Sequence, residues 1–156
     1  MCETVILGSP TVNGFRIRQL ESFCPVNNSW GFDNRTVGIR IIEGKDSKVR
    51  VEKRHAGADA NPYLLLAGDI AVSLDGIECE LKPTQPTMGN AYRQAYGDLI
   101  PTDPATAIEL ARASGWFKDV LGEDQWELYC QICERELGFF NKQVTPVELN
   151  RYLKTL

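Results

Sequence analysis

The sequence predicts an α+β fold, in which antiparallel strands early in the chain are followed by several α-helices. On both sides of a turn at residues 43–47, apolar and polar residues alternate, which is the pattern of a half-buried β-hairpin. From residue 61 onward the apolar residues follow the spacing of amphipathic helices. Because strands come first and helices follow, the two kinds of element should form one α+β unit with a small sheet.

Length and composition limit the classes of protein that fit. The 156 residues match one domain of common size, and 43% hydrophobic with 24% charged residues is ordinary for a globular protein. A formal net charge of −4 argues against a general nucleic-acid binder, which needs a basic surface. No apolar run reaches the roughly 18–20 residues that span a bilayer, and the N-terminus lacks a signal-peptide pattern. We therefore expect a cytoplasmic protein that binds neither nucleic acid nor membrane.

The cysteines are odd in number, scattered and without a secretory signal, so we expect reduced thiols at Cys2, Cys24, Cys79, Cys130 and Cys133. The Cys130-x-x-Cys133 spacing also occurs in zinc and redox sites. However, this pair lies in a strongly helical segment, and there is no second pair to complete four zinc ligands. Two buried, inert thiols on successive helical turns are therefore the expectation.

The strands are expected in the first third of the chain. Residues 1–12 are apolar but short and end in a turn, and residues 13–33 form a loop that leads to a short strand around Trp30. The hairpin strands follow over residues 36–41 and from Val49 onward. Two or three strands are marginal alone. The sheet should therefore continue through strands outside the chain or pair with another copy.

The helices should fill the remainder. Asn61 is a good N-cap, and Pro62 suits the first helical position. Thr145 and Glu148 form the capping-box pattern before the last helix. The expected helices cover residues 61–78, 103–113, 114–122, 124–140 and 145–154, the third of them capped by Ser114. We expect the first helix to be long and mostly buried, because its apolar stripe is broad.

The candidate site is a row of charged residues on the second hairpin strand. Arg50, Glu52 and Arg54 occupy alternate positions, so their side chains should project from one face about 6.5–7 Å apart. Arg40 on the first strand and Arg35 at its entry should reach the same surface. A carboxylate among arginines suits a divalent cation and a phosphorylated, carboxylate-bearing substrate. The alternative is a solvated, salt-bridged strand face.

Other polar and aromatic residues have plainer expected roles. Asp59 and Asn61 should cap a turn and a helix. His55 adjoins the arginine row and could act as a general base, but an ordinary turn histidine is the simpler interpretation. The aromatic residues of the helical part have the spacing of core or interface residues: Trp116, Phe117, Trp126, Phe139 and Phe140.

Several short motifs stand in the order and at the spacing of one known family. They are Pro10-Thr11-Val12-Asn13, Trp30-Gly31-Phe32-Asp33-Asn34-Arg35, Arg40, Arg50-x-Glu52-x-Arg54, Asp59-Ala60-Asn61-Pro62-Tyr63-Leu64 and Leu74-Asp75-Gly76-Ile77. Together these motifs resemble the glutamine synthetase family, and the helical tail up to Glu148 is similar as well. The resemblance covers nearly the whole chain.

The resemblance implies an ATP-dependent ligase. In this family ATP phosphorylates the side-chain carboxylate of glutamate, and ammonia or an amine displaces phosphate from the γ-glutamyl phosphate. Two divalent metals, Mg²⁺ or Mn²⁺, and several arginines neutralise the transferring phosphoryl group. By position, Glu52 matches a metal ligand. Arg35 and Arg54 match catalytic arginines at the phosphate and the glutamate end, and Arg35, Arg40 and Arg50 match phosphate-binding arginines.

Two departures from the family pattern concern the substrate carboxylate and the amine. Where ammonia-using members hold an arginine for the substrate carboxylate, this chain has Ile17, and Arg16 or Arg18 is the candidate replacement. Where they hold a glutamate that binds ammonium, this chain has Phe23. Loss of that carboxylate makes ammonium a doubtful acceptor. The chain is therefore more similar to the branch that joins glutamate to polyamines or other amines.

The resemblance also implies how the chain is organised. Residues 1–156 match the C-terminal portion of a glutamine synthetase catalytic domain, with strands and loops at about 1–55 and helices at about 61–156. A complete member is expected to be roughly three times this length, so the N-terminal small domain and the first part of the catalytic domain are absent here. The family's active site lies between subunits. A homo-oligomer, or association with the missing catalytic part, is therefore implied.

One glutamate cannot hold two metals, so we expect the chain to be inactive alone. It should act as part of a ligase whose substrates are ATP, glutamate and an amine or ammonia. Two alternatives stay open. The chain could be a non-catalytic remnant that packs on or regulates a full-length synthetase. It could also be a nucleotide- or polyanion-binding module that uses the arginine face.

Overall fold

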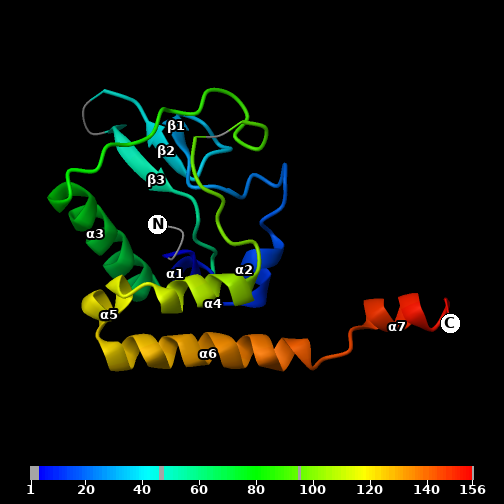
Figure 1. Ribbon diagram of the computed structural model, residues 1–156. Coiled ribbons are helices and arrows are strands. Elements are labelled where there is room, and N and C mark those ends of the chain that lie inside the picture. Colours follow the sequence, from blue (N-terminus) through cyan, green and yellow to red (C-terminus); the bar gives the residue numbers. More distant parts are fainter. Residues whose placement is uncertain (1–3, 46–47, 95, 156) are drawn as a thin grey trace.

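The structure is a computed structural model that describes residues 4–45, 48–94 and 96–155. Two predictions fall outside these residues, namely the thiol of Cys2 and the part of the hairpin turn at residues 46–47. The described elements are α1 (Val5–Gly8), α2 (Val12–Arg16), β1 (Trp30–Phe32), β2 (Ile39–Ile42), β3 (Arg50–Lys53), α3 (Pro62–Glu78), α4 (Pro104–Ala113), α5 (Trp116–Leu121), α6 (Glu123–Asn141) and α7 (Pro146–Tyr152). A small sheet lies on one side of the molecule, and most helices form a layer below it (Figure 1). This order confirms the predicted α+β fold class.

The three strands form one sheet in the order β1-β2-β3. β2 and β3 make the predicted antiparallel hairpin, in which Arg40 lies opposite Glu52. β1 pairs with β2 in parallel, which departs from the antiparallel arrangement that we expected. The cause is local. The chain leaves β1 through Asp33, whose φ is 44°, and Asn34 then closes a turn by accepting a hydrogen bond from the N–H of Thr36. A single turn would give an antiparallel pair, so the connection of residues 33–38 must carry the chain back along β1 before β2 begins.

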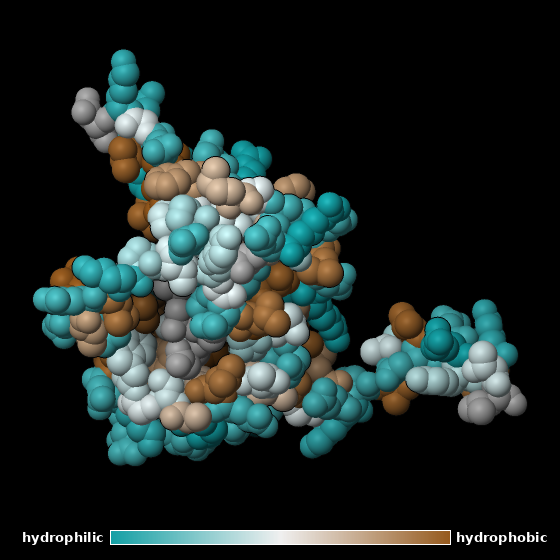
Figure 2. Space-filling model, turned by 45° about the horizontal axis from the view of Figure 1, so that its top comes forward, coloured by the Kyte–Doolittle hydropathy of each residue, from teal (hydrophilic) through white to brown (hydrophobic). Residues whose placement is uncertain are grey.

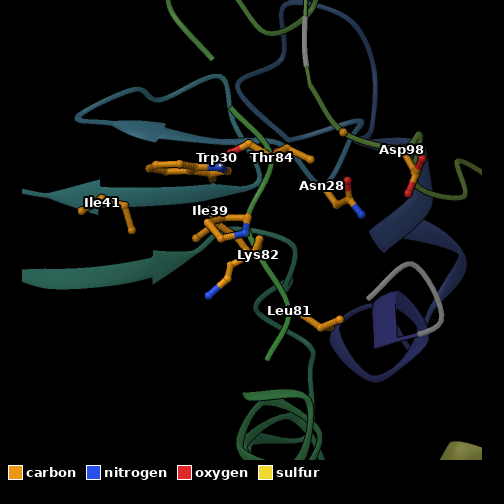
Figure 3. Close-up of a pocket in the computed structure, with 10 residues that line it drawn as sticks. Asn28, Trp30, Ile39, Ile41, Leu81, Lys82, Thr84 and Asp98 are labelled. Atoms are coloured by element: carbon orange, nitrogen blue, oxygen red, sulfur yellow. Dashed lines mark hydrogen bonds between the residues drawn. The ribbon is translucent and has the colours of Figure 1, made fainter. Parts of the chain in front are cut away.

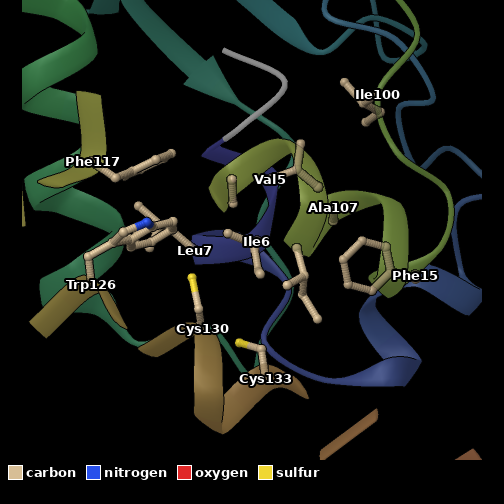
Figure 4. Packing of buried hydrophobic residues seen from close by; sticks show 12 residues of the cluster. Val5, Ile6, Leu7, Phe15, Ile100, Ala107, Phe117, Trp126, Cys130 and Cys133 are labelled. Carbon is tan, nitrogen blue, oxygen red and sulfur yellow. The ribbon is translucent and has the colours of Figure 1, made fainter. Parts of the chain in front are cut away.

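The main hydrophobic core lies within the helical layer (Figure 4). Phe117 of α5 and Trp126 of α6 are fully buried there and stack with their ring centroids 4.3 Å apart. The described cluster contains no strand residue and consists of Val5, Ile6, Leu7, Phe15, Ile100, Ala107, Ile108, Ala111, Phe117, Trp126, Cys130 and Cys133. The helical layer therefore lies beneath the sheet, and the outer face of the sheet is polar.

Cys130 and Cys133 lie in this core as predicted, and both are free thiols. Burial raises the pKa of each thiol to about 11, so both stay protonated at neutral pH. Cys24 and Cys79 are also free. The prediction of buried, inert thiols at the Cys130-x-x-Cys133 pair is therefore confirmed.

Helix α3 is long, as predicted, but it is not mostly buried. Only Gly68 is buried, whereas Leu66, Ile70 and Ile77 are 58%, 60% and 73% exposed. The helix packs on α1 and α5 along one side. The prediction was wrong because apolar residues occur on more than one side of this helix, and the neighbouring elements cover only part of its circumference.

The helix ends follow the predicted capping signals with one exception. The side chain of Asn61 accepts hydrogen bonds from the first turn of α3, and Thr145 and Glu148 form the capping box of α7. Ser114 does not cap α5. It closes the C-terminus of α4 instead, and Gly115 occupies the N-cap position of α5 without a side-chain hydrogen bond.

The last helix stands away from the rest of the molecule (Figure 1, Figure 2). None of the residues of α7 is buried. Within the described ranges, no helix is both long and apolar enough to cross a membrane.

Candidate active site on the hairpin

Glu52 lies between two arginines on the polar face of the hairpin. Strand pairing places Arg40 directly opposite it, and Arg54 follows two residues later. Glu52 Oε2 accepts a hydrogen bond from Arg40 Nη1 at 3.3 Å, and Oε1 accepts one from Arg54 Nε at 3.1 Å. The register of the hairpin therefore brings these three predicted residues together.

Arg54 also ties the site to three backbone segments. Its Nη1 donates to the carbonyl of Val37 at 3.2 Å and to that of Arg35, and its Nη2 donates to the carbonyl of Phe23 at 3.0 Å. Together with the bond to Glu52, these contacts occupy most of the five N–H donors of the guanidinium. Arg54 thus fixes the loops that surround Glu52.

The guanidinium of Arg35 faces the solvent beside Glu52 and Arg54. Its side chain is exposed, and it makes no hydrogen bond or ion pair with the residues that the structure describes. It borders a depression of about 400 Å³ together with Phe23, Arg40, Glu52 and Arg54. The guanidinium fork matches phosphate and carboxylate oxygens. An anion in this depression would therefore meet a cation without a competing partner.

The other predicted arginines lie outside this depression. Arg50 is exposed at the start of β3 and donates to a backbone carbonyl two residues earlier. Arg16 is exposed at the end of α2 and bonds to a side chain three residues earlier. Arg18, the other candidate for the substrate carboxylate, is buried and donates to the carbonyl of His55 at 2.8 Å. The structure thus gives Arg18 a structural position and does not bring Arg16 or Arg50 into the cluster.

The described residues do not by themselves fit a divalent cation. Mg²⁺ needs about six oxygen ligands. The described part of the chain holds no group of three or more His, Cys, Asp or Glu side chains that could hold a metal ion. Both oxygens of Glu52 are also engaged by arginines. Glu52 can therefore supply one carboxylate to a metal site only if other ligands come from elsewhere.

Asp33 lies in the site, although we predicted no role for it. Its carboxylate forms an ion pair with Arg40. It lines, with Phe23, Arg35 and Met88, a second depression of about 630 Å³ that shares several residues with the first. The sequence signal was the position of Asp33 in the motif that ends at Arg35. That motif alone does not show that Arg40, seven residues later, turns back toward this carboxylate.

His55 is buried behind the site, in the segment that follows β3, and not in the ordinary turn that we expected. Its Nε2 faces the carbonyl of Asn27 at 3.4 Å, and its Nδ1 has no hydrogen-bond partner in the part of the chain that is described. Burial, aided by the charge of Lys53, lowers the pKa of His55 to about 4. The loop after β3 turns into the interior, where a neutral imidazole is favoured. His55 therefore supports the fold beneath the hairpin.

Acid should destabilise the protein through His55. An unfolded histidine has a pKa of about 6.5, whereas folded His55 has a pKa of about 4, so the unfolded chain binds the proton first between these values. The free energy of unfolding should be at its maximum above about pH 6.5 and should fall by roughly 3 kcal/mol as the pH approaches 4. Urea titrations across this range measure the loss, and His55→Gln should remove most of it.

The chain has a single histidine, so one imidazole NMR signal reports the folded pKa directly, even where the glutamine variant folds poorly. A signal that titrates near the ordinary value of about 6.5 would contradict this burial.

A larger cavity lies on the other face of the sheet (Figure 3). It measures about 840 Å³, and its lining includes Trp30, Ile39, Ile41 and Leu81. Neither Glu52 nor any arginine borders it. Because group transfer needs convergent charged groups, we place the candidate site at the smaller depressions on the polar face.

The sequence and the fold of this chain are similar to those of known proteins. The family described as glutamine synthetase, catalytic domain, matches residues 1–152. The chain is 38% identical to the glutamate–isopropylamine ligase of a Pseudomonas species, over 92% of this chain and 32% of that protein. It is 37% identical to the gamma-glutamylethanolamide synthetase of Streptomyces coelicolor, over 96% of this chain and 32% of that protein. The solved structure of apo GmaS without ligand matches with a TM-score of 0.82 and 26% identity, over 97% of this chain and 35% of that chain. The chain thus spans about a third of the length of the curated relatives that it matches.

Proposed function

The chain belongs to the glutamine synthetase family, within the catalytic domain, and from this premise we propose that it is the C-terminal part of an ATP-dependent glutamate–amine ligase. One observation carries the proposal. Glu52 is held between Arg40 and Arg54, and the exposed Arg35 borders the same depression. Such a cluster can neutralise a phosphoryl group while it moves from ATP to a carboxylate.

The position and the hydrogen bonds of each arginine indicate a different role. Arg35 and Arg40 bind the phosphate that is transferred, because both border the depression and Arg35 is exposed. Arg54 orders the surrounding loops, and we assign its remaining N–H to the glutamate substrate. Arg50 and Arg16 lie outside the depression, and we assign them to the nucleotide phosphates and the substrate carboxylate in the complete enzyme.

We assign one ligand of a Mg²⁺ or Mn²⁺ site to Glu52. The remaining ligands must come from outside the described residues, because no group of three or more His, Cys, Asp or Glu side chains among these residues could hold a metal ion. We further propose that the rest of the active site is contributed by a partner segment or by a neighbouring copy in a homo-oligomer. The free, buried thiols of Cys130 and Cys133 fit a reducing compartment such as the cytoplasm.

Calorimetry with the full chain separates this proposal from its alternatives. A retained half-site should bind MgATP, and Glu52→Gln should weaken that binding while leaving metal-free phosphate binding intact. Equal binding of phosphate with and without Mg²⁺, unaffected by Glu52→Gln, would favour a polyanion-binding module. Absence of binding, with assembly onto a full-length synthetase, would leave a non-catalytic remnant.

Arg35→Ala should reduce ligase activity strongly without unfolding the protein. The test uses a completed enzyme, in which this chain replaces the matched third of the glutamate–isopropylamine ligase. Loss of one donor to the developing charge costs about 10²–10³ in turnover. ATP-dependent phosphate release with glutamate and amine measures it. Arg135→Ala on α6 is the matched control, and an Arg35 variant as active as this control would contradict the assignment.

A further inference from the structure

Residues 87–92, which we call the support segment, belong to the connector between α3 and α4 and pack against β1. The N–H of Thr87 donates to the carbonyl of Trp30 at 2.7 Å. Gly31 permits this close approach, because a Cβ atom at that position would lie 2.8 Å from the carbonyl oxygen of Thr87. Both Thr87 and Ala91 are buried. The support segment is therefore fixed to the sheet.

Asn34 and Thr36 join the support segment to the loop that carries Arg35. The side-chain amide of Asn34 donates to two carbonyls of the segment, and that of Gly89 is the closer, at 2.7 Å. Asn34 Oδ1 accepts from the N–H of Thr36 at 2.9 Å. Thr36 Oγ1 accepts from the N–H of Ala91, also at 2.9 Å. The residues on both sides of Arg35 are thus bonded to the support segment.

Tyr92 joins the support segment to a second loop, which carries Phe23. The hydroxyl of Tyr92 donates to the carbonyl of Cys24 at 2.8 Å. The preceding carbonyl, that of Phe23, accepts from Arg54 Nη2 at 3.0 Å. Phe23 has a φ of 59°, which is unfavourable for a residue with a side chain and persists only where the surrounding structure holds it. Arg54 and Tyr92 hold it by binding successive carbonyls.

Both loops border the depression of the candidate site. Phe23 and Arg35 line it beside Glu52. Strand pairing places Arg40 opposite Glu52, but Phe23 and Arg35 lie outside the strands. The side chain of Arg35 makes no hydrogen bond or ion pair with the described residues, so its place depends on the backbone that carries it. Donors stabilise a developing charge only when they are held in place beforehand.

We propose that Tyr92 and Asn34 are positioning residues, through which the support segment holds the loops of Phe23 and Arg35 around the candidate site. Neither side chain borders the depression that contains Glu52, so both act through the loops. This role rests on the proposed ligase function and adds two residues to its site. It also makes the connector after α3 part of the functional apparatus.

Tyr92→Phe removes one hydroxyl and keeps the ring, and Tyr129→Phe is its matched control. The hydroxyl of Tyr129 also donates to a backbone carbonyl at 2.8 Å, that of Ile6, but within the helical layer. In the completed enzyme, Tyr92→Phe should lower kcat about tenfold, because displaced loops misplace the donors to the transferring phosphoryl group. The KM for ATP should stay within about twofold. Tyr129→Phe should leave both constants as in the parent, even where it lowers the midpoint of unfolding.

Asn34→Asp tests the other loop. The new carboxylate can still accept from the N–H of Thr36, but it cannot donate to the carbonyls of the support segment. The kcat should again fall at least about tenfold, with the KM for ATP little changed. Asn141→Asp, at the exposed end of α6, adds the same charge away from the site and should behave as the parent does.

Hydrogen exchange of the full chain tests the support without requiring turnover. The amides of residues 20–24 should exchange at least about threefold faster in Tyr92→Phe than in the parent, because a loop that loses a hydrogen bond opens more often. In Tyr129→Phe the exchange of residues 20–24 should equal that of the parent.

A Tyr92→Phe enzyme with the kcat of the parent would overturn the inference. Equal losses of kcat in Tyr92→Phe and Tyr129→Phe, or unchanged exchange of residues 20–24 in Tyr92→Phe, would do the same. The ligase proposal fails separately, if Arg35→Ala and Glu52→Gln leave turnover intact. If those two variants lose turnover while Tyr92→Phe keeps it, only the positioning role is wrong.

Discussion

Replacing Arg54 with alanine should destabilise the protein by about 3 kcal/mol, because the substitution removes a largely buried, charged hydrogen-bond donor from a network. The guanidinium bonds to Glu52 and to the backbone carbonyls of Phe23, Arg35 and Val37. Without it the carboxylate of Glu52 keeps only Arg40 as a partner, and the loop that carries Phe23 loses its hydrogen bond to the residue that follows β3. Urea denaturation measures the change as a lower midpoint with an unchanged slope.

Two variants show whether geometry or charge is responsible. Arg50→Ala removes an exposed arginine of the same strand, which bonds only to a nearby carbonyl, and should change stability by less than about 0.5 kcal/mol. Arg54→Lys keeps the charge but cannot reach several carbonyls at once, so it should recover less than half of the loss. Equal effects of Arg54→Ala and Arg50→Ala would show that the network adds nothing to the fold.

Replacing Trp126 with alanine should have an effect as large or larger, about 3–5 kcal/mol, because it opens a cavity in the core of the helical layer. The indole is fully buried and stacks on two rings. Its centroid lies 4.3 Å from that of Phe117 and 5.9 Å from that of Tyr129. Stacked pairs add about 0.5–1.5 kcal/mol beyond the buried area. Thermal and urea unfolding of the full chain give the difference.

The phenylalanine variant refines this prediction. The indole Nε1 of Trp126 is buried without a hydrogen-bond partner among the described residues. Trp126→Phe removes that unpaired donor, so its cost should stay below about 1.5 kcal/mol. Leu128→Ala on the same helix removes a 58% exposed side chain and should cost less still. A similar loss in Trp126→Ala and Leu128→Ala would contradict the assignment of the core.

The hairpin and most helices could be predicted because their signals are local. Alternation around the turn sets the register that pairs Arg40 with Glu52, and Asn61 and Thr145 mark helix starts through their own side chains. The parallel pairing of β1 could not be predicted in this way. It depends on the backbone at Asp33 and on a turn whose direction is not visible in the spacing of apolar residues.

The cluster of charges at the candidate site was predictable, but its network of contacts was not. Alternation put Glu52 near Arg54, yet only the fold shows that Arg54 reaches the carbonyl of Phe23, 31 residues away. The burial of His55 and the exposure of α3 likewise depend on which elements pack beside them. Such contacts between distant segments have no signature within a single segment.

The most direct test of the account is ligase activity after a change at Glu52. In the completed enzyme, Glu52→Gln keeps the size and the hydrogen-bond acceptor of the side chain but removes its charge. We expect γ-glutamylamide formation and ADP release to fall by about a hundredfold or more, with unfolding of the chain little changed. Activity within about threefold of the parent enzyme would show that Glu52 and its arginines are a surface ion-pair network and not part of the active site.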